Sequence, residues 1–322
     1  MMESRGTWTD LIPDVGLRIS EVFDQATEQY RPGIGNILTL TSGEGAQKNY
    51  SGKTGLGEVS LFEEGDNING GNRYKTYTTK VEYNNYGNYV QVTKNNIEDR
   101  DFEAQLDEMK DLAESMGYSQ DKSGMQLFNG GFATTRLVNG YRMTFYGDSV
   151  PTFSTVHPTV VPGGSTQSNA SSTGITFGHD NLETAKVAMT LQHTDDGLAL
   201  ALGGKPMLTV PLNLEREARE ETESTLDPET GNNAINVHRG TTDMASSIHL
   251  DSVNGGSDTA WFLNVPGRTK WYHEVRQAPM MDSDVDILSK NVTFTVDARW
   301  ANYVKDWRRC WGSKGDGASY TS

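Results

Sequence analysis

The segment Ile97–Met116 constrains the fold most, because its apolar side chains recur at the spacing of a helix. The apolar positions, separated by steps of four and three residues, are Phe102, Leu106, Met109, Ala113 and Met116. Glu98, Asp99 and Asp101 crowd the first turn, where the helix dipole favours carboxylates. About twenty residues at 1.5 Å each make a rod of roughly 30 Å. We predict a long helix here that packs one face on a core and ends near Gly117.

Two other segments alternate between apolar and polar residues, as half-buried strands do. Every second residue from Val292 to Trp300 is apolar, which predicts a strand with one buried face. Residues 77–83 alternate in the same way, and a turn region rich in Gly, Asn and Asp precedes them. We therefore predict an extended hairpin in which a strand at Gly57–Phe62 pairs with the returning strand. A two-stranded ribbon is marginally stable alone, so we expect it to lie against something else, such as another subunit.

The composition is that of a polar globular chain with a large negative charge. Among 322 residues, 43 acidic and 28 basic side chains give a formal net charge of −15. A nucleic-acid-binding module needs a basic face to neutralise phosphates, so this charge argues against one. The acidic surface would suit a protein that lies near DNA without adhering to it, and equally one that only needs solubility. The length allows two domains and a sizeable core.

Cysteine usage and hydropathy indicate where the chain is made. The single cysteine, Cys310, excludes an intrachain disulfide framework and is most simply a free thiol in a reducing compartment. No apolar run approaches the length of a membrane span, and the first residues lack the basic start and apolar core of a signal peptide. We expect a product of the cytoplasm that has no membrane partner.

Patterns that resemble catalytic or metal-binding motifs fail at required positions. Gly52–Thr54 looks like the end of a phosphate-binding loop, but Gln47 stands where the earlier glycine is needed. The three acids of Asp282–Asp286 mimic a calcium loop, but Ile287 replaces its glycine and Thr293 its bidentate acid. We interpret this second segment as a solvated acidic loop, which leaves a weak cation site open.

The remaining polar residues show no catalytic or ligand spacing either. The histidines are His157, His179, His193, His238, His249 and His273. None of them is spaced like the HxxxH pair of a zinc site, and the GxSxG nucleophile elbow is absent. We therefore predict no enzyme, no catalytic residue, no cofactor and no metal site.

Taken in order, the expected elements resemble the major capsid protein of tailed bacteriophages, the Hong Kong 97-type fold. The resemblance runs from about Leu11 to Trp311 and rests on the order of the elements more than on any one motif. Leu127–Gly131 is similar to the family's frequent LNGDG segment. Lys205–Pro211, followed by a helix from Leu214, looks like the strand–helix step of this fold.

The resemblance implies an α+β fold with an N-terminal arm, an extended β-hairpin (E-loop), a P-domain with a long spine helix, and an A-domain. The implied division is 1–48 for the N-terminal arm, 49–92 for the E-loop hairpin and lead-in strand, 93–195 for the P-domain with the spine helix, 196–288 for the A-domain, and 289–322 for the returning P-domain strand and C-terminal tail.

The resemblance also implies a function. A major capsid (head) protein self-assembles into pentamers and hexamers, which form an icosahedral shell around phage double-stranded DNA. The expected partners are copies of itself, a portal protein at one vertex, and packaged DNA nearby without sequence-specific binding. The arm is too short for the fused scaffolding domain of many members, so we expect a separate scaffolding protein. The expected location is the virion, with the host cytoplasm during assembly.

The hairpin is the part that should reach a neighbouring subunit. The expected contact residues are Phe62, Tyr74, Tyr77 and Tyr83. In some members an E-loop lysine forms an isopeptide bond with an asparagine of a neighbour. Lys53, Lys75 and Lys80 lie in this region, but no motif singles one out, so we predict no covalent cross-link.

Two alternatives remain open at this point. Another phage structural part, such as a tail tube or decoration protein, would be mostly β and would lack a long spine helix. A cytosolic enzyme with an unrecognised site would form a stable small oligomer with a ligand-filled pocket.

Overall fold

The computed structural model describes residues 8–29, 33–59, 61–64, 67, 70–99, 101, 103–226 and 234–318. Its helices are α1 (Trp8–Gln29), η1 (Gly33–Asn36), α2 (Lys94–Asp99), α3 (Glu103–Asn129), α4 (His179–Thr190), η2 (Leu212–Leu214), α5 (Glu215–Glu223), η3 (Ile248–Leu250) and η4 (Ser252–Asn254). Its strands are β1 (Thr39–Ser42), β2 (Gln47–Tyr50), β3 (Thr79–Glu82), β4 (Asn84–Val92), β5 (Leu137–Val138), β6 (Tyr141–Thr144), β7 (Met207–Val210), β8 (Asp243–Ser246), β9 (Trp261–Asn264), β10 (Trp271–Val285), β11 (Val292–Val304) and β12 (Cys310–Ser313).

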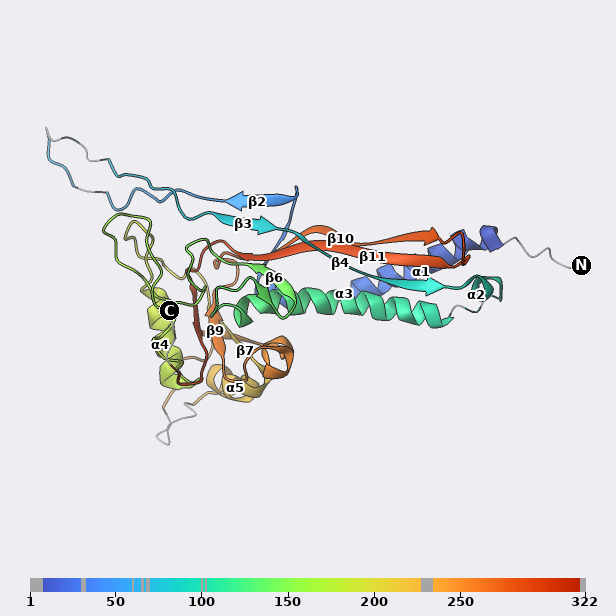
Figure 1. Cartoon of the computed structure of the whole chain (residues 1–322). Coiled ribbons are helices and arrows are strands. Elements are labelled where there is room, and N and C mark those ends of the chain that lie inside the picture. The colour runs from blue at the N-terminus through green and yellow to red at the C-terminus, as the bar shows by residue number, and fades with distance from the viewer. Residues whose placement is uncertain are drawn as a thin grey trace, which may run out of the picture.

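These elements form a long narrow body, a more compact region at one end, and a loop that projects from the same end (Figure 1). The narrow body contains the larger sheet, whose strand order is β1-β10-β11-β6-β5, with β4 also paired to β11. β10 and β11 run antiparallel along most of its length. The helices α1 and α3 extend in the same direction as these strands, so the body is long in one dimension.

The strand predicted from Val292 to Trp300 is confirmed, and it continues as β11 to Val304. From Val292 to Trp300 the alternate apolar residues are buried and the residues between them are exposed or half-buried, whereas every residue of β11 after Trp300 is buried. The buried side chains pack with α1, α3 and β4 in one cluster, which includes Ile19, Phe23, Val92, Leu106, Met109, Met116, Phe294 and Trp300. The apolar stripe of α3 and the apolar face of β11 therefore pack against each other in a single core, and each element covers the apolar surface of the other.

The long helix predicted at Ile97–Met116 is confirmed in kind, but its boundaries differ. Ile97 belongs to the short α2, and α3 runs from Glu103 to Asn129 without stopping at Gly117. Gly117 is buried within the helix. A glycine inside a helix costs only about 1 kcal/mol relative to alanine. The buried residues of the last turns, such as Phe128, gain more than that from packing, so the helix continues.

Gly124 of α3 marks the closest approach of this helix to η1. A Cβ at this position would lie 1.4 Å from Cδ1 of Ile34 and 2.8 Å from its Cγ1. We expect Gly124→Ala to lower the free energy of unfolding by about 1–2 kcal/mol, because overpacking of 1–3 kcal/mol exceeds the helix-propensity gain of about 1 kcal/mol. Urea denaturation measures this.

Ile34→Val provides the control, because it removes the Cδ1 methyl group that would clash with a Cβ at residue 124. In an Ile34→Val background, Gly124→Ala should cost less than in the native background, which a double-mutant cycle reports. Equal costs in both backgrounds would show that the packing of α3 against η1 does not depend on this contact.

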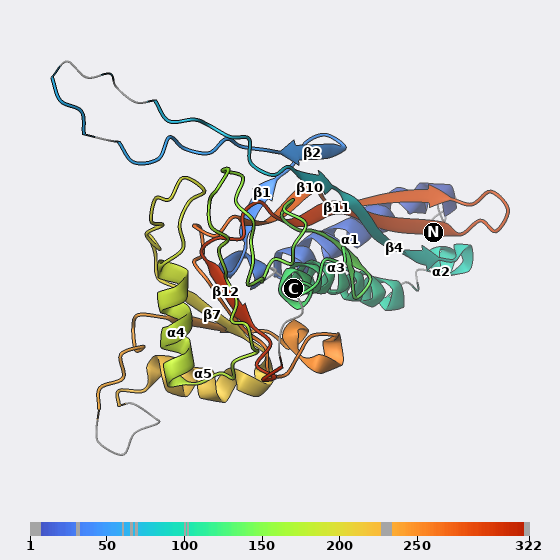
Figure 2. The ribbon, with the colours of Figure 1, turned by 60° about the vertical axis from the view of Figure 1, so that its left-hand side comes forward.

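The compact region is built on the smaller sheet, of order β12-β9-β7-β8, with α4 and α5 packed on it (Figure 2). Its core includes Leu182, Met189, Leu208, Val210, Ala218, Trp261, Leu263 and Trp311. α4 and β12 belong to this region although the predicted A-domain range, 196–288, omits them. β10 lies inside that range but pairs in the larger sheet. The two sheets thus divide the chain differently from the predicted boundaries, because chain order does not reveal which sheet a strand joins.

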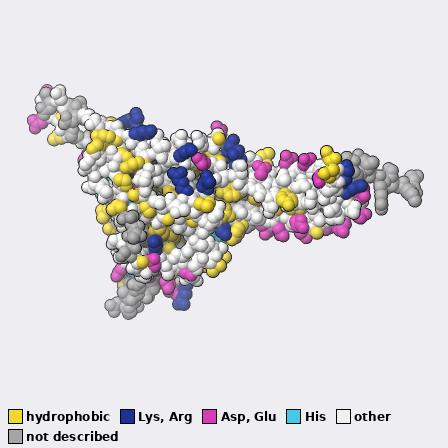
Figure 3. All heavy atoms as spheres, in the orientation of Figure 1, with side chains coloured by type: hydrophobic (Ala, Val, Ile, Leu, Met, Phe, Trp, Pro, Cys, Tyr) yellow, Lys and Arg dark blue, Asp and Glu magenta, His cyan; other side chains and the backbone are white. Residues whose placement is uncertain are grey.

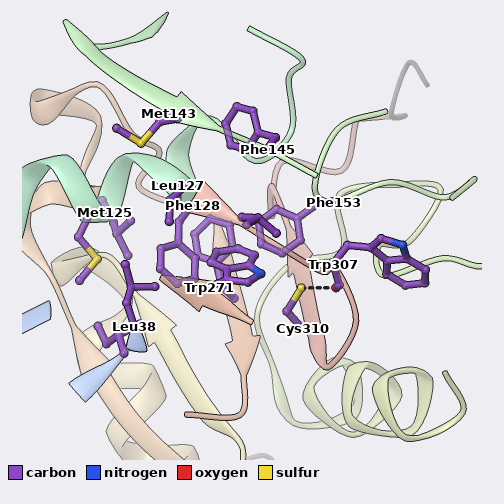
Figure 4. Packing of buried hydrophobic residues seen from close by; sticks show 14 of the residues in the cluster. Leu38, Met125, Leu127, Phe128, Met143, Phe145, Phe153, Trp271, Trp307 and Cys310 are labelled. Carbon is purple, nitrogen blue, oxygen red and sulfur yellow. Dashed lines mark hydrogen bonds between the residues drawn. The ribbon is translucent and has the colours of Figure 1, made fainter. Parts of the chain in front are cut away.

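An aromatic cluster connects the compact region to the narrow body (Figure 4). The ring centroid of Phe128 lies 4.8 Å from that of Trp271 and 5.1 Å from that of Phe262. Cys310 is fully buried beside them, and its thiol donates to the backbone oxygen of Trp307 at 2.7 Å. Burial raises the pKa of this thiol well above its usual value, so Cys310 is a packing residue and not a nucleophile.

The predicted hairpin exists, and β3 lies within its predicted returning strand, but the partner strand is not the predicted one. β2 pairs with β3 in an antiparallel register from Gln47↔Glu82 to Tyr50↔Thr79. The described residues of Gly57–Phe62 form no strand, so that prediction is wrong. Apolar residues at 57–62 suggested burial within a ribbon, whereas their side chains are exposed. We call residues 51–78 the projecting loop; both ribbon views show its described part extending beyond the body.

No helix in the described part of the chain is long and apolar enough to cross a membrane.

Candidate assembly surfaces

The projecting loop carries apolar side chains that the rest of the chain leaves uncovered. Leu56 is 55% exposed, Val59 93%, Leu61 97% and Phe62 53%. Figure 3 shows hydrophobic side chains at the surface near this projecting end, whereas acidic side chains gather along the narrow body. Fully burying a side chain of this size is worth about 1.5–3 kcal/mol. The loop therefore gains free energy wherever a second surface covers it.

The backbone hydrogen bonds across the loop that involve its described residues lie near its base. The Thr54 backbone amide donates to the Tyr74 carbonyl at 2.8 Å, and the Thr76 amide donates to the Gly52 carbonyl at 3.0 Å. The four exposed apolar side chains belong to residues 56–62, which lie farther from the body than the Thr54–Tyr74 hydrogen bond. The base of the loop therefore sets its direction, and the segment beyond it presents apolar surface.

A buried carboxylate, Glu274 of β10, fixes that base to the larger sheet. Tyr83 donates to its Oε1 at 2.8 Å, Tyr303 donates to its Oε2 at 2.5 Å, and Tyr50 donates to Oε2 at 3.2 Å. Lys48 forms an ion pair with Oε1. We call these five residues the Glu274 cluster. Because they come from β2, from the residue between β3 and β4, and from β10 and β11, the cluster joins the hairpin to the body.

The pKa shifts of Glu274 and Tyr83 indicate the charge state of the cluster. Burial alone would raise the pKa of Glu274, but the hydrogen bonds from Lys48 and then from Tyr303 and Tyr83 outweigh it, and the pKa lies below its usual value. Burial, followed by the hydrogen bond to Glu274, raises the pKa of Tyr83 to about 12. Near neutral pH the carboxylate is therefore charged, and the phenols of Tyr83 and Tyr303 keep their protons.

This lowered pKa predicts a loss of stability in acid. Glu274 titrates near its ordinary value of 4.5 in the unfolded chain and lower in the folded chain. Its contribution is therefore complete above about pH 4.5 and disappears as the pH falls through the folded pKa. We expect the urea midpoints of the native chain and of Glu274→Gln to differ at pH 7 and to converge on acidification. Midpoints that keep a constant separation down to pH 3 would contradict this.

An aromatic stack strengthens the same attachment. The ring of Tyr303 stacks on Tyr50 at 5.4 Å and on Tyr272 at 5.3 Å between centroids. The ammonium of Lys305 lies 3.6 Å from the centroid of Tyr50 and 4.2 Å from that of Tyr272. Cation–π contacts at this distance contribute about 0.5–2 kcal/mol.

The four contact residues expected from the sequence occupy different environments. Phe62 is exposed on the projecting loop. Tyr74 is half-buried, and Tyr77 packs edge-on against Tyr146 at 5.8 Å. Tyr83 is only 8% exposed within the Glu274 cluster, which leaves little of it for a neighbour. The expected contacts did not include Leu56, Val59 and Leu61. Their apolar side chains, in a segment that forms a loop, are the signal that could have identified them.

The turn between β10 and β11 is a second uncovered apolar surface, with Ile287 78% and Leu288 93% exposed. Asp286 caps this turn: it accepts from the Leu288 amide at 3.0 Å and from the Ser289 hydroxyl at 2.6 Å. The hydrogen bond from Ser289, followed by that from Leu288, lowers the pKa of Asp286. The predicted acidic loop at Asp282–Asp286 is wrong, because its first part is the end of β10.

Two buried polar clusters contain histidines that sequence spacing did not connect. His157 Nδ1 lies 2.7 Å from Asp148 Oδ2, and both side chains are fully buried. The ring of His157 stacks on Trp307 at 3.9 Å, and its Nε2 lies 3.1 Å from Asn169 Oδ1. Protein groups thus engage both ring nitrogens, so this pair is a structural link and is not placed to transfer protons to a substrate.

The second cluster brings together His179, Glu221 and His238, which lie in three separate segments. A regular spacing along the chain could not reveal it, because the fold alone creates the proximity. The prediction of no metal site rested on local spacing and did not consider this arrangement.

Comparison with known proteins supplies the fold class. No protein-family model matches this sequence, and no curated protein matches it. Solved structures do match. The capsid of an empty GTA particle gives a TM-score of 0.53 at 9% identity, covering 86% of this chain and 87% of that chain. The capsid of Myoviridae phage XM1 gives 0.52 at 11% identity, covering 87% and 90%. The capsid of cyanophage P-SCSP1u gives 0.52 at 10% identity, covering 88% of each.

The chain and these capsid structures share one fold. The chain has the α+β Hong Kong 97-type capsid fold, which confirms the fold predicted from the order of its elements.

Proposed function

We propose that this chain is the major capsid protein of a tailed bacteriophage or a related particle. It assembles into pentamers and hexamers that form an icosahedral shell around double-stranded DNA. One observation carries the proposal beyond the fold: the projecting loop extends outward with Leu56, Val59, Leu61 and Phe62 uncovered.

A ring of identical subunits supplies the missing cover. When the loop of each subunit lies on the next subunit, the contact is heterologous, and a rotation that closes it gives a ring. Four apolar side chains at about 1.5–3 kcal/mol each give at most about 6–12 kcal/mol, against roughly 4–15 kcal/mol lost in association. The loop alone about balances that cost. Further contacts, such as the β10–β11 turn, are needed, so assembly is cooperative.

The fold suggests a role for each region in such a shell. The body with α3 and the larger sheet acts as the P-domain, and the region with the smaller sheet, α4 and α5 acts as the A-domain at the ring centre. The projecting loop acts as the E-loop.

Further partners belong to the same proposal. They are a separate scaffolding protein, a portal protein at one vertex, and packaged double-stranded DNA that lies nearby without sequence-specific binding. The net charge of −15 supports the last of these, because an acidic wall repels phosphates and leaves the genome free to move. The protein is located in the virion, and in the host cytoplasm during assembly.

The structure gives less support to the alternative functions. A tail tube or decoration protein would be mostly β, whereas α3 alone has 27 residues. An enzyme would use an accessible acid–base pair, and the His157–Asp148 pair does not offer one because both side chains are fully buried.

Sedimentation velocity over a range of protein concentrations, with electron microscopy of the fastest species, tests assembly. We expect rings or shells whose fraction rises with concentration, alone or with a scaffolding protein. A monomer or small oligomer of constant size under both conditions would contradict the proposal.

A further inference from the structure

Three side chains with metal-binding atoms converge in the compact region. His179 lies at the start of α4, Glu221 lies in α5, and His238 lies in the segment between α5 and β8. Their ligand atoms all lie within 4.8 Å of one another. The side chains of His179, Glu221 and His238 are 14%, 6% and 0% exposed.

Contacts among His179, Glu221 and His238 hold the three side chains close together. Nδ1 of His179 lies 2.8 Å from Oε2 of Glu221, and the two imidazole centroids are 4.3 Å apart. Nε2 of His238 lies 3.2 Å from the backbone oxygen of His179. Ligands at about 2.0–2.2 Å from a tetrahedral zinc ion lie about 3.3–3.6 Å apart. Small side-chain rotations therefore convert the present spacing into a coordination shell.

Among the described residues, the cation of Lys186 lies close to the site and disfavours a metal ion there. Nζ of Lys186 lies 3.2 Å from Nδ1 of His238 and 3.2 Å from the hydroxyl of Thr241. It also lies 3.9 Å from a carboxylate oxygen of Glu183, which in turn lies 3.8 Å from Nδ1 of His238. Lys186 thus keeps two other partners, Thr241 and Glu183, when a metal ion takes its place beside His238.

We propose that His179, Glu221 and His238 bind one divalent transition-metal ion of the zinc class. Two imidazoles and one carboxylate suit zinc, cobalt or nickel better than magnesium or calcium, which prefer oxygen ligands. Three protein ligands leave a fourth position for water. The bound ion ties the start of α4 to α5 and to the segment before β8. All three ligands belong to one chain, so the site does not depend on shell assembly.

The test uses the full chain after treatment with a chelator. Calorimetric titration with Zn²⁺ should show one strong site, and Co²⁺ should give the visible absorption of a tetrahedral site. His238→Ala and Glu221→Gln should each weaken binding at least about 100-fold, because even outer-shell changes cost 10–100-fold. His193→Ala is the matched control, since His193 is exposed and outside the cluster, and its affinity should stay unchanged.

Lys186→Met separates this site from adventitious binding. Removal of a cation 3.2 Å from a ligand atom should strengthen zinc binding about tenfold or more. Circular dichroism of the metal-free variants checks folding, and Glu221→Gln carries the test if His238→Ala does not fold, because it keeps the volume of the side chain. Absence of stoichiometric binding by the native chain, or equal affinities across the variants, would overturn the proposal.

Discussion

Replacement of Leu56, Val59, Leu61 and Phe62 by serine should abolish assembly without unfolding the subunit. In the single chain these side chains are mostly exposed, so their loss removes little intrachain packing. In a ring their burial contributes up to about 6–12 kcal/mol per subunit. If only a third of the upper figure is realised, about 4 kcal/mol, the concentration needed for assembly rises about 1000-fold.

Sedimentation velocity and thermal unfolding, measured on the same preparations, check this prediction. The matched control replaces Glu58 and Glu64 of the same loop with glutamine, which keeps the loop length and its apolar residues. The control should assemble at a concentration near that of the native chain. A serine variant that assembles as readily as the native chain would show that the loop is not a contact surface.

Glu274→Gln should lower the free energy of unfolding by about 3 kcal/mol and release the base of the projecting loop. Removal of one partner of a buried ion pair costs about 3–5 kcal/mol. The lower end applies because the side chain of Lys48 is 29% exposed and regains water when its partner is lost. The amide also has only one oxygen, so its NH2 group replaces the acceptor of either Tyr83 or Tyr303, and the bond that remains is weaker because the charge is lost.

Urea denaturation measures the stability of this variant, and hydrogen exchange of the β2 and β3 amides reports the release of the loop base. Glu44→Gln is the control, because Glu44 is an exposed glutamate close to β2. The account fails here if Glu274→Gln and Glu44→Gln have the same stability and the same exchange rates. Subunits with a released loop should also assemble more slowly, since the loop no longer has a fixed direction.

Periodicity predicted the elements whose two faces differ in polarity. β11 carries alternate apolar residues because one face lies on α3, and that difference is visible in the sequence. Likewise, the stripe of α3 that includes Met109 faces a core. The end of α3 was not predicted, because Gly117 locally favours a helix end. The helix continues because its last turns are buried by residues distant in sequence, which local patterns do not show.

The pairing of the hairpin and the polar clusters could not be read from local patterns. β2 is short and polar, and only its register with β3 identifies it as a strand. Tyr83 looks like a surface aromatic on an alternating strand, yet it donates to Glu274, which is 191 residues away. His179, Glu221 and His238 meet for the same reason, since only the fold brings distant segments together.

The central claim is that the projecting loop completes its burial on another copy of the chain. A high-resolution electron cryomicroscopy map of the assembled particle tests it most directly. The account predicts density for Leu56, Val59, Leu61 and Phe62 against the surface of the adjacent subunit, with the Glu274 cluster intact at the base. A map in which these side chains fold back onto their own subunit, or touch no protein at all, would contradict it.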